Sequence, residues 1–172
     1  MTRPLHPLAP GFTLLEVLIA IVVLSFGLMG LAGIQATGVR NTHSANLRTL
    51  AVQQAYDMAD RMRANAQGVK DGLYDALPAT LPATTPSDPG CISTGCSTTQ
   101  LRDYDQRFWN MNNKAMLPSG TGGVMLVPGT TAPNKAYVIT VMWDDYRKGV
   151  TGLSCSGDPA VDLTCFSIIF RP

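Results

Sequence analysis

The longest apolar segment of the chain runs from Val17 to Ile34 and contains no charged side chain. Its 18 residues come close to the roughly 20 that an α-helix needs to cross the hydrocarbon layer of a membrane. No proline interrupts the chain from Phe12 to about Ala66. We therefore expect one helix of about 55 residues, which at 1.5 Å per residue would be about 80 Å long and would extend well beyond a membrane.

The distal half of this expected helix has one apolar face. Apolar or small residues recur there three and four positions apart, which is the spacing of a single helix face. They are Leu47, Leu50, Ala51, Ala55, Met58, Ala59 and Met62. Such a stripe needs a globular head to pack against, and Gly68 is the expected end of the helix.

Beyond the helix, the pattern predicts a loop, a second helix and strands. Residues 68–100 are rich in Pro, Thr, Gly and Ser and read as a surface loop. An amphipathic helix is expected from Gln100 to about Met116, with Trp109 in the core. The residues expected to point inward are Leu101, Tyr104, Phe108, Met111 and Ala115.

Three strands are expected near the end of the chain. Their β-branched and aromatic content favours the ranges Gly123–Val127, Ala136–Trp143 and Leu163–Phe170. In the last strand, Phe166, Ile168 and Phe170 share one face by the two-residue period, and we assign this face to the long helix. The predicted fold class is α+β, with a long helix packed on a small antiparallel sheet.

Glu16 is the only glutamate of the chain and stands immediately before the apolar run. A carboxylate that enters a bilayer unpaired costs roughly 2.5–3.5 kcal/mol on insertion scales. Glu16 follows Gly11-Phe12-Thr13-Leu14-Leu15, and the segment before Gly11 has a single positive charge, Arg3. A glycine and, five residues later, one acid thus precede the apolar run.

These residues resemble the class III signal of type IV prepilins and related pseudopilins. In that family a membrane-embedded peptidase cuts after the glycine and methylates the new N-terminal phenylalanine. The resemblance implies a cut between Gly11 and Phe12, N-methylation of Phe12, and Glu16 as the fifth mature residue. The stretches NLRTLAVQQAYDMADRMRAN and LRDYDQRFWNMN, with two cysteines between them, look like the V-type minor pilins, or type IV pilus modification proteins. This narrower resemblance covers about the first two-thirds of the chain.

An ordinary secretory signal peptide or a plain membrane anchor is the alternative for the N-terminus, since Gly33-Ile34-Gln35-Ala36 could pass for a small-residue cleavage site. A conventional signal has an apolar core of about 7–15 residues preceded by basic residues. Here the apolar run is longer and an acid borders it. Gly27, Gly30 and Gly33 are open to two interpretations, close packing between membrane helices or a stretch of weakened helix.

Glu16 and Phe12 suggest how subunits would assemble. After cleavage, the amine of Phe12 and the carboxylate of Glu16 would carry opposite charges in a medium of low dielectric, where paired charges attract strongly and unpaired charges are penalised. We hypothesise that the Phe12 amine of a neighbouring subunit neutralises Glu16 as subunits come together.

The composition limits the other functions. A chain of 172 residues predicts one domain. Removal of residues 1–11 takes away Arg3 from the 13 basic side chains and leaves 12 basic and 12 acidic ones, so no basic footprint for nucleic acid stands out.

The four cysteines, Cys91, Cys96, Cys155 and Cys165, all follow the apolar run. An even number in an oxidising compartment favours disulfides. Three pairings are possible; the local one, Cys91–Cys96 and Cys155–Cys165, is favoured because each pair flanks a turn with Gly and Ser. A zinc site is the rival, but the spacings are not the usual ones.

The sequence offers little for an enzyme. Its two histidines are His6 in the expected leader and His43 on the helix, so a Ser-His-Asp or Cys-His arrangement is not available in the head. Asp144 and Asp145 could bind calcium or act in acid–base chemistry, but a polar turn explains them more simply. We predict no catalytic residue, no metal site and no cofactor.

The predicted organisation is a leader over residues 1–11, a transmembrane and assembly segment over 12–35, and a periplasmic head over 36–172. The resemblance implies a minor pilin in the inner membrane and then in the pilus, taking part in nucleation or in a tip complex. Expected partners are other minor pilins, the major pilin, the prepilin peptidase and the assembly platform. The alternatives are a pseudopilin of type II secretion and a membrane-anchored adhesin or binding module.

Overall fold

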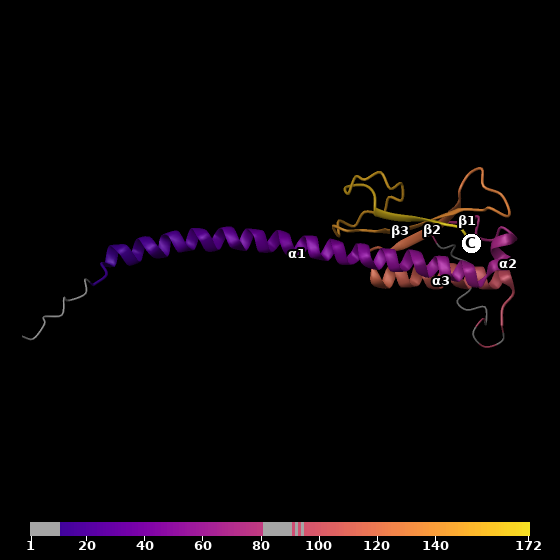
Figure 1. Ribbon diagram of the computed structural model, residues 1–172, viewed down its shortest axis with the longest axis horizontal. Coiled ribbons are helices and arrows are strands. Elements are labelled where there is room, and N and C mark those ends of the chain that lie inside the picture. The colour runs from indigo at the N-terminus through magenta and orange to yellow at the C-terminus, as the bar shows by residue number, and fades with distance from the viewer. Residues whose placement is uncertain (1–10, 81–90, 92, 94) are drawn as a thin grey trace, which may run out of the picture. The chain divides into compact units, whose positions relative to one another are not determined.

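The computed structural model describes residues 11–80, 91, 93 and 95–172 (Figure 1). The chain forms two compact units, one that ends at His43 and one that runs from Ser44 to Pro172, which we call the head. Residues 1–10 of the predicted leader and most of the Pro-rich part of the predicted loop lie outside the described residues.

The long helix α1 runs from Leu14 to Ala64, close to the predicted range. Its first part, up to His43, belongs to the first unit, and the part from Ser44 to Ala64 belongs to the head. Thr13 caps the start of the helix, because its Oγ1 accepts a hydrogen bond of 3.3 Å from the main-chain N–H of Glu16.

The head contains a four-stranded antiparallel sheet in the order β1-β2-β3-β4. The strands are β1 (Ala76–Leu77), β2 (Thr121–Leu126), β3 (Tyr137–Trp143) and β4 (Thr164–Phe170). The last three correspond to the predicted strands, shifted by one or two residues, whereas β1 was not predicted. The α+β fold class is confirmed.

The core of the head lies between the sheet and the distal half of α1. The predicted helix face supplies most of the α1 contribution, since Leu47, Ala51, Ala55, Met58, Ala59 and Met62 are all buried. From the sheet, Phe170 is buried, and Phe166 and Ile168 pack against the same cluster. The prediction that this face of β4 meets the long helix is confirmed.

The predicted end of the helix at Gly68 is wrong. α1 ends at Ala64, and after Asn65 a short second helix, α2, runs from Ala66 to Lys70 and contains Gly68. Asn65 causes the break because its side chain caps α2, accepting a hydrogen bond of 3.3 Å from the N–H of Gly68. The glycine fits tightly against that side chain rather than ending a helix.

The last helix, α3, runs from Thr98 to Met116 and begins with a capping box between Ser97 and Gln100. Trp109 is fully buried, as predicted, and donates a hydrogen bond of 2.7 Å from Nε1 to the carbonyl of Gln54.

The predicted inward face of α3 is wrong. The side chains that are buried, besides Trp109, are Asp105, Gln106, Asn110 and Asn113. Hydrogen bonds explain most of this inversion. Gln106 donates to the carbonyl of Pro78, and Asn110 both donates to the carbonyl and accepts from the N–H of Gly122. The polar side of α3 therefore meets β2 and Pro78, the residue after β1.

Candidate assembly site

The residues of the predicted processing site lie at the start of the described chain. Gly11 and Phe12 precede α1, and the Phe12 side chain is 85% exposed. Glu16 is in the first turn of α1, where the partial positive charge of a helix N-terminus favours a carboxylate. The main-chain N–H of Glu16 donates to Thr13 Oγ1, so Glu16 stands three residues after the residue that caps the helix.

The apolar run is exposed along its whole length. Its large hydrophobic side chains, from Val17 to Ile34, are between 48% and 74% exposed. Among the described residues, α1 is the one helix that is long and apolar enough to cross a membrane, with a mean hydropathy of 2.6 over 18 residues. Burial of such a surface is worth roughly 25 cal/mol per Å², so the segment requires an apolar partner outside its own unit.

The glycines of the apolar run have no packing role within the chain. α1 is helical through Gly27, Gly30 and Gly33, and a Cβ added at any of them would meet nothing within 4 Å. Their small size is therefore free to serve contacts with other helices or to weaken this one. Both interpretations stay open.

Two family models match the N-terminal part of the chain, including the apolar run. Residues 10–32 match the family model of the prokaryotic N-terminal methylation motif, and residues 33–107 match the model described as type IV pilin Tt1218. The two matches adjoin and together span more than half of the chain. This chain belongs to the type IV pilins. Neither a curated protein nor a solved structure matches it.

The methylation motif gives the N-terminal residues of this pilin a role. It implies processing by a prepilin peptidase and assembly with other pilins. The matched residues include Gly11, Phe12 and Glu16, which are the residues of the predicted cut and the predicted assembly contact. The exposed apolar helix of the pilin is consistent with anchoring in a membrane and with packing in a pilus.

The structure joins the cysteines of the pilin head in two local pairs, Cys91 with Cys96 and Cys155 with Cys165. The first pair lies just before α3, and the second ties the loop after β3 to β4. The first disulfide therefore closes a short loop before α3, and the second holds a surface loop against β4.

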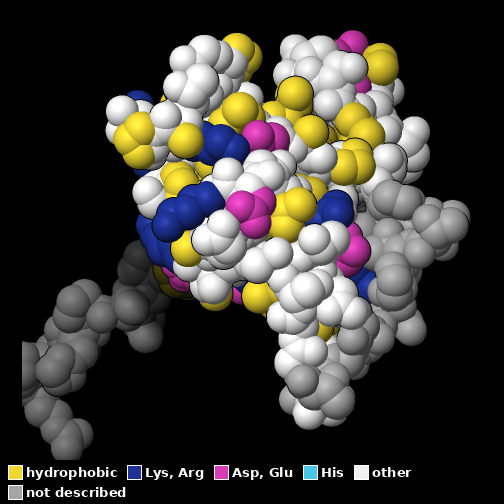
Figure 2. All heavy atoms as spheres, turned by 90° about the vertical axis from the view of Figure 1, so that its right-hand side faces the viewer, with side chains coloured by type: hydrophobic (Ala, Val, Ile, Leu, Met, Phe, Trp, Pro, Cys, Tyr) yellow, Lys and Arg dark blue, Asp and Glu magenta, His cyan; other side chains and the backbone are white. Residues whose placement is uncertain are grey.

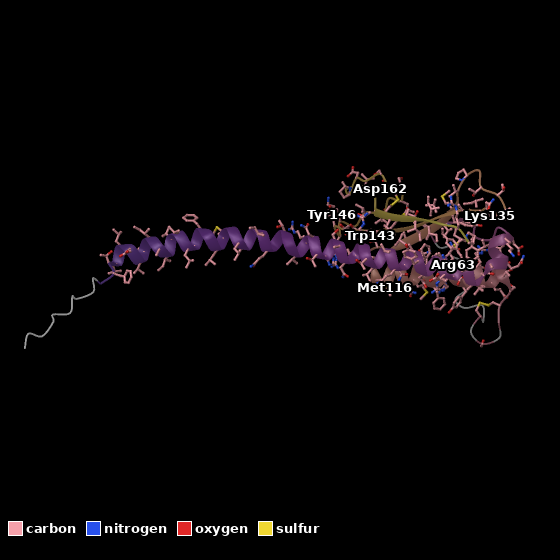
Figure 3. The ribbon with its side chains drawn as sticks, in the orientation of Figure 1. Arg63, Met116, Lys135, Trp143, Tyr146 and Asp162 are labelled. Carbon is pink, nitrogen blue, oxygen red and sulfur yellow. A yellow bond between two sulfur atoms is a disulfide. The ribbon has the colours of Figure 1, made fainter. Side chains whose placement is uncertain are left out.

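The aspartates after β3 hold the head together. Asp145 accepts hydrogen bonds from Ser44 Oγ at 2.7 Å and from Trp143 Nε1 at 3.0 Å, which links α1 to the end of β3. Asp144 is buried and accepts from the N–H of Gly149 at 2.7 Å. Figure 3 labels Trp143 and Tyr146 in this region. The polar turn that the sequence analysis preferred is present.

Asp162 organises the loop that the second disulfide closes. Its carboxylate accepts hydrogen bonds from the N–H groups of Ser154 and Ser156. The side-chain hydrogen bond of Ser156, followed by these main-chain bonds, lowers the pKa of Asp162. Among the described residues, no three His, Cys, Asp or Glu side chains converge as metal ligands would.

A polar network between α1, α3 and the α2–β1 turn escaped the sequence analysis. Tyr74 donates a hydrogen bond of 2.6 Å to Asp105, and Arg61 lies 3.5 Å from the same carboxylate. Asn65 donates to Tyr74 at 3.0 Å. Burial raises the pKa of Asp105, although the Tyr74 hydrogen bond and the charge of Arg61 oppose the rise.

An apolar groove of about 660 Å³ crosses the outer face of the sheet, between the Ala76–Ala79 segment and the disulfide loop. Met125, Val138, Thr140, Met142 and Leu153 are among its lining residues, and none of the described lining residues ionises. On the end of the head shown in Figure 2, basic and acidic side chains lie next to one another. Neither surface has the charge pattern of a catalytic centre or a nucleic-acid interface.

Proposed function

We propose that this pilin is a minor pilin of the V type that takes part in type IV pilus assembly, in nucleation or in a tip complex. The exposed apolar run carries the proposal, because a helix without partners in its own unit must be covered first by lipid and later by other subunits. The predicted organisation, with a leader over residues 1–11, a membrane segment over 12–35 and a periplasmic head over 36–172, belongs to the same proposal.

Glu16 guides the assembly step in this proposal. The subunit waits in the inner membrane with its head in the periplasm. When subunits meet, the carboxylate of Glu16 pairs with the Phe12 amine of a neighbour, and the pairing removes the cost of holding an isolated charge in an apolar medium. Each helix is thereby drawn to a fixed depth beside the next one.

The sequence of the N-terminus tests the processing step. Mass spectrometry of the protein extracted from membranes is expected to find N-methylated Phe12 as the first residue. A mature chain that starts just after the Gly33-Ile34-Gln35-Ala36 segment would instead identify an ordinary signal peptide and overturn the proposal.

Substitution of Glu16 tests the assembly step. Glu16→Gln keeps the size of the side chain and removes its charge, so we expect normal cleavage but co-extraction with partner pilins reduced about tenfold, the change that 1.4 kcal/mol produces. Glu16→Asp keeps the charge and serves as the control. Wild-type levels of co-extraction and of surface pili in the Gln variant would contradict the assembly role.

The runner-up is a pseudopilin of type II secretion, which shares the same N-terminal features. Deletion of the gene separates the two: loss of surface pili with normal secretion supports the pilus, and the reverse supports secretion. An adhesin held by the same anchor would instead lose surface binding while pili remain at normal number.

A further inference from the structure

β4 forms an open edge of the sheet. It is the last strand in the order β1-β2-β3-β4, and it pairs with β3 through seven consecutive residues without a bulge. In the parts of the chain that the structure describes, no main-chain group of residues 164–170 forms a hydrogen bond outside this ladder. The N–H and C=O groups on the outer side of β4 are therefore available to a further strand.

β4 lacks the features that ordinarily protect a sheet edge, which is commonly kept short or carries charges or proline. The opposite edge follows this rule, because β1 has two residues and is followed by Pro78, which has no N–H to donate. β4 has seven residues with neither a charge nor a proline among them. Its Ile169 is 69% exposed. Such an edge is suited to binding an extended chain by strand addition.

The core of the head is incomplete at the β4 edge. Phe166 and Ile168 pack against the core cluster but are only partly buried. Their pairing partners on β3, Val141 and Ile139, are fully buried. A strand added to β4 would cover the exposed parts of Phe166 and Ile168, so we expect it to carry apolar side chains on its core-facing side.

One side of α1 flanks the open edge. The guanidinium of Arg63, which Figure 3 labels, lies 4.9 Å from the centre of the Phe170 ring. Tyr56 and Val52 precede Arg63 by seven and eleven residues, so they share this side of the helix. Tyr56 is 56% exposed, and aromatic residues are enriched at protein interfaces. We call the outer edge of β4, together with Val52 and Tyr56, the β4 edge site.

β4 and α1 run in the same direction within the head. Arg63 and Phe170, which meet, are near the ends of their elements. At the other end, Ser44 binds Asp145, which follows the end of β3 that pairs with the start of β4. Subunits anchored in one bilayer have α1 helices of common direction, and their β4 strands therefore share a direction as well.

This shared direction argues against a second copy of the chain as the partner. Two β4 strands paired antiparallel would turn the two α1 helices in opposite directions. Two β4 strands paired parallel would place the helices on opposite faces of the joined sheet and so keep them apart. A copy displaced sideways in the same orientation would offer its β1 edge, which is only two residues long. The added strand must therefore come from a different protein.

We propose that the β4 edge site binds an extended strand from the head of a different pilin subunit, one whose strand is uncharged and apolar on its core-facing side. The inference rests on the proposed function, since shared membrane anchoring holds the two heads side by side. The short β1 edge leaves this head one long edge for pairing, which suits a subunit that ends a row of heads in a nucleation or tip complex.

Photo-crosslinking in native membranes tests the β4 edge site. The full-length protein carries p-benzoylphenylalanine in place of Tyr56, or in place of Met125 as the control. Met125 is 67% exposed on β2, so both probes are accessible. We expect adducts from position 56, at least about tenfold above position 125, with a protein whose own N-terminus is a cleaved prepilin sequence.

A charge on the edge strand supplies a matched substitution. In the Tyr56 probe background, Ile169→Lys is expected to lower the adduct yield about tenfold, because a lysine on an edge strand opposes pairing. Met125→Lys, at a similarly exposed position of the sheet, is expected to leave the yield unchanged. Thermal unfolding of both variants checks that the head remains folded.

Amide hydrogen exchange separates strand pairing from side-chain packing alone. In the co-extracted complex, peptides that cover Thr164–Phe170 should exchange at least about tenfold more slowly than in the same protein from cells without the other pilin genes, because paired N–H groups exchange only on opening. Peptides that cover Ala76–Leu77 should exchange equally in the two samples. Unchanged exchange in β4 would contradict strand addition.

Adducts only with a second copy of this chain, with lipid or with a protein lacking the prepilin N-terminus would overturn the inference, as would equal yields at positions 56 and 125. If the mature N-terminus is Phe12 and Glu16 behaves as proposed while position 56 gives no adduct, the inference about the β4 edge site fails and the proposed function stands.

Discussion

At the scale of single residues, the packing of α3 on the sheet depends on a glycine. A Cβ at Gly122 would collide with the buried ring of Trp109 and would lie 2.9 Å from the carbonyl oxygen of Thr140. The same residue binds Asn110 through both its N–H and its carbonyl. Gly122 thus lets the indole and the amide of one helix approach the backbone of β2.

We expect Gly122→Ala to lower the free energy of unfolding of the head by about 1–3 kcal/mol, the usual cost of overpacking. Thermal unfolding followed by near-ultraviolet circular dichroism measures it. Gly38→Ala is the control, because a Cβ there meets nothing within 4 Å. Equal unfolding temperatures for the two variants would show that α3 can shift to make room.

Two buried tyrosines predict how the head responds to alkaline pH. Burial, followed by the hydrogen bonds to Asp105 and Asp75, raises the pKa of Tyr74 and of Tyr137 well above the ordinary value near 10. Above about pH 10 the unfolded chain releases these protons while the folded head keeps them. The free energy of unfolding then falls as pH rises, by up to about 1.4 kcal/mol per pH unit for each tyrosine.

Denaturant titrations between pH 9 and pH 11.5 measure this slope. Tyr74→Phe or Tyr137→Phe should remove the share of one tyrosine, whereas Tyr146→Phe, at a side chain that is 63% exposed, should leave the slope as it is. If the free energy of unfolding fell with pH equally in all three variants, groups other than Tyr74 and Tyr137 would cause the loss of stability at alkaline pH.

At the scale of elements, the two disulfides differ in the loops that they close. Cys155 and Cys165 are 10 residues apart in sequence and Cys91 and Cys96 are 5 apart. A longer closed loop restricts the unfolded chain more. Replacing both cysteines by serine should therefore lower the free energy of unfolding by about 3 kcal/mol for Cys155–Cys165 and by about 2 kcal/mol for Cys91–Cys96.

Calorimetry of the two double variants checks the order of these losses, and peptide mapping without reduction checks the pairing. Cross-linked peptides that join Cys91 or Cys96 to Cys155 or Cys165 would contradict the local scheme.

The sequence predicted the elements whose cause is local. The proline-free stretch predicted the long helix α1. The β-branched and aromatic residues of Tyr137–Trp143 and Thr164–Phe170 predicted strands β3 and β4. The face of α3 depended on distant backbone, because the partners of Gln106 and Asn110 are Pro78 and Gly122. Periodicity alone therefore chose the wrong side, and the two residues of β1 are too few to give a pattern.

The candidate site divides in the same way. Gly11, Phe12 and Glu16 could be found because they form one continuous signature with the apolar run. The network around Asp105 could not be found from the sequence, because Tyr74 lies 31 positions away. Neither a tyrosine nor an aspartate indicates by its type which residue it will bind.

At the scale of the whole molecule, the division at Ser44 predicts that the head folds without the first unit. Residues 44–172 form a compact unit with their own core, and the exposed apolar run lies outside them. We expect a fragment of residues 44–172, exported to an oxidising compartment, to be soluble and to unfold cooperatively without detergent.

The full-length protein should require detergent under the same conditions. Comparison of the near-ultraviolet circular dichroism of the two preparations checks that the fragment keeps the packing of Trp109 and Trp143. A fragment that aggregates or unfolds without a transition would show that the first unit is needed for the head to fold.

The link from Ser44 through Asp145 to Trp143 joins the start of the head to the end of β3, beside the packed face of α1. Ser44 is the first residue of the head, so tension along α1 would reach the Ser44–Asp145 hydrogen bond before the rest of the head. Asp145 also binds Trp143 at the end of β3, the strand that is paired on both sides over most of its length. We expect a pull along β3 to be shared among the hydrogen bonds of both ladders at once.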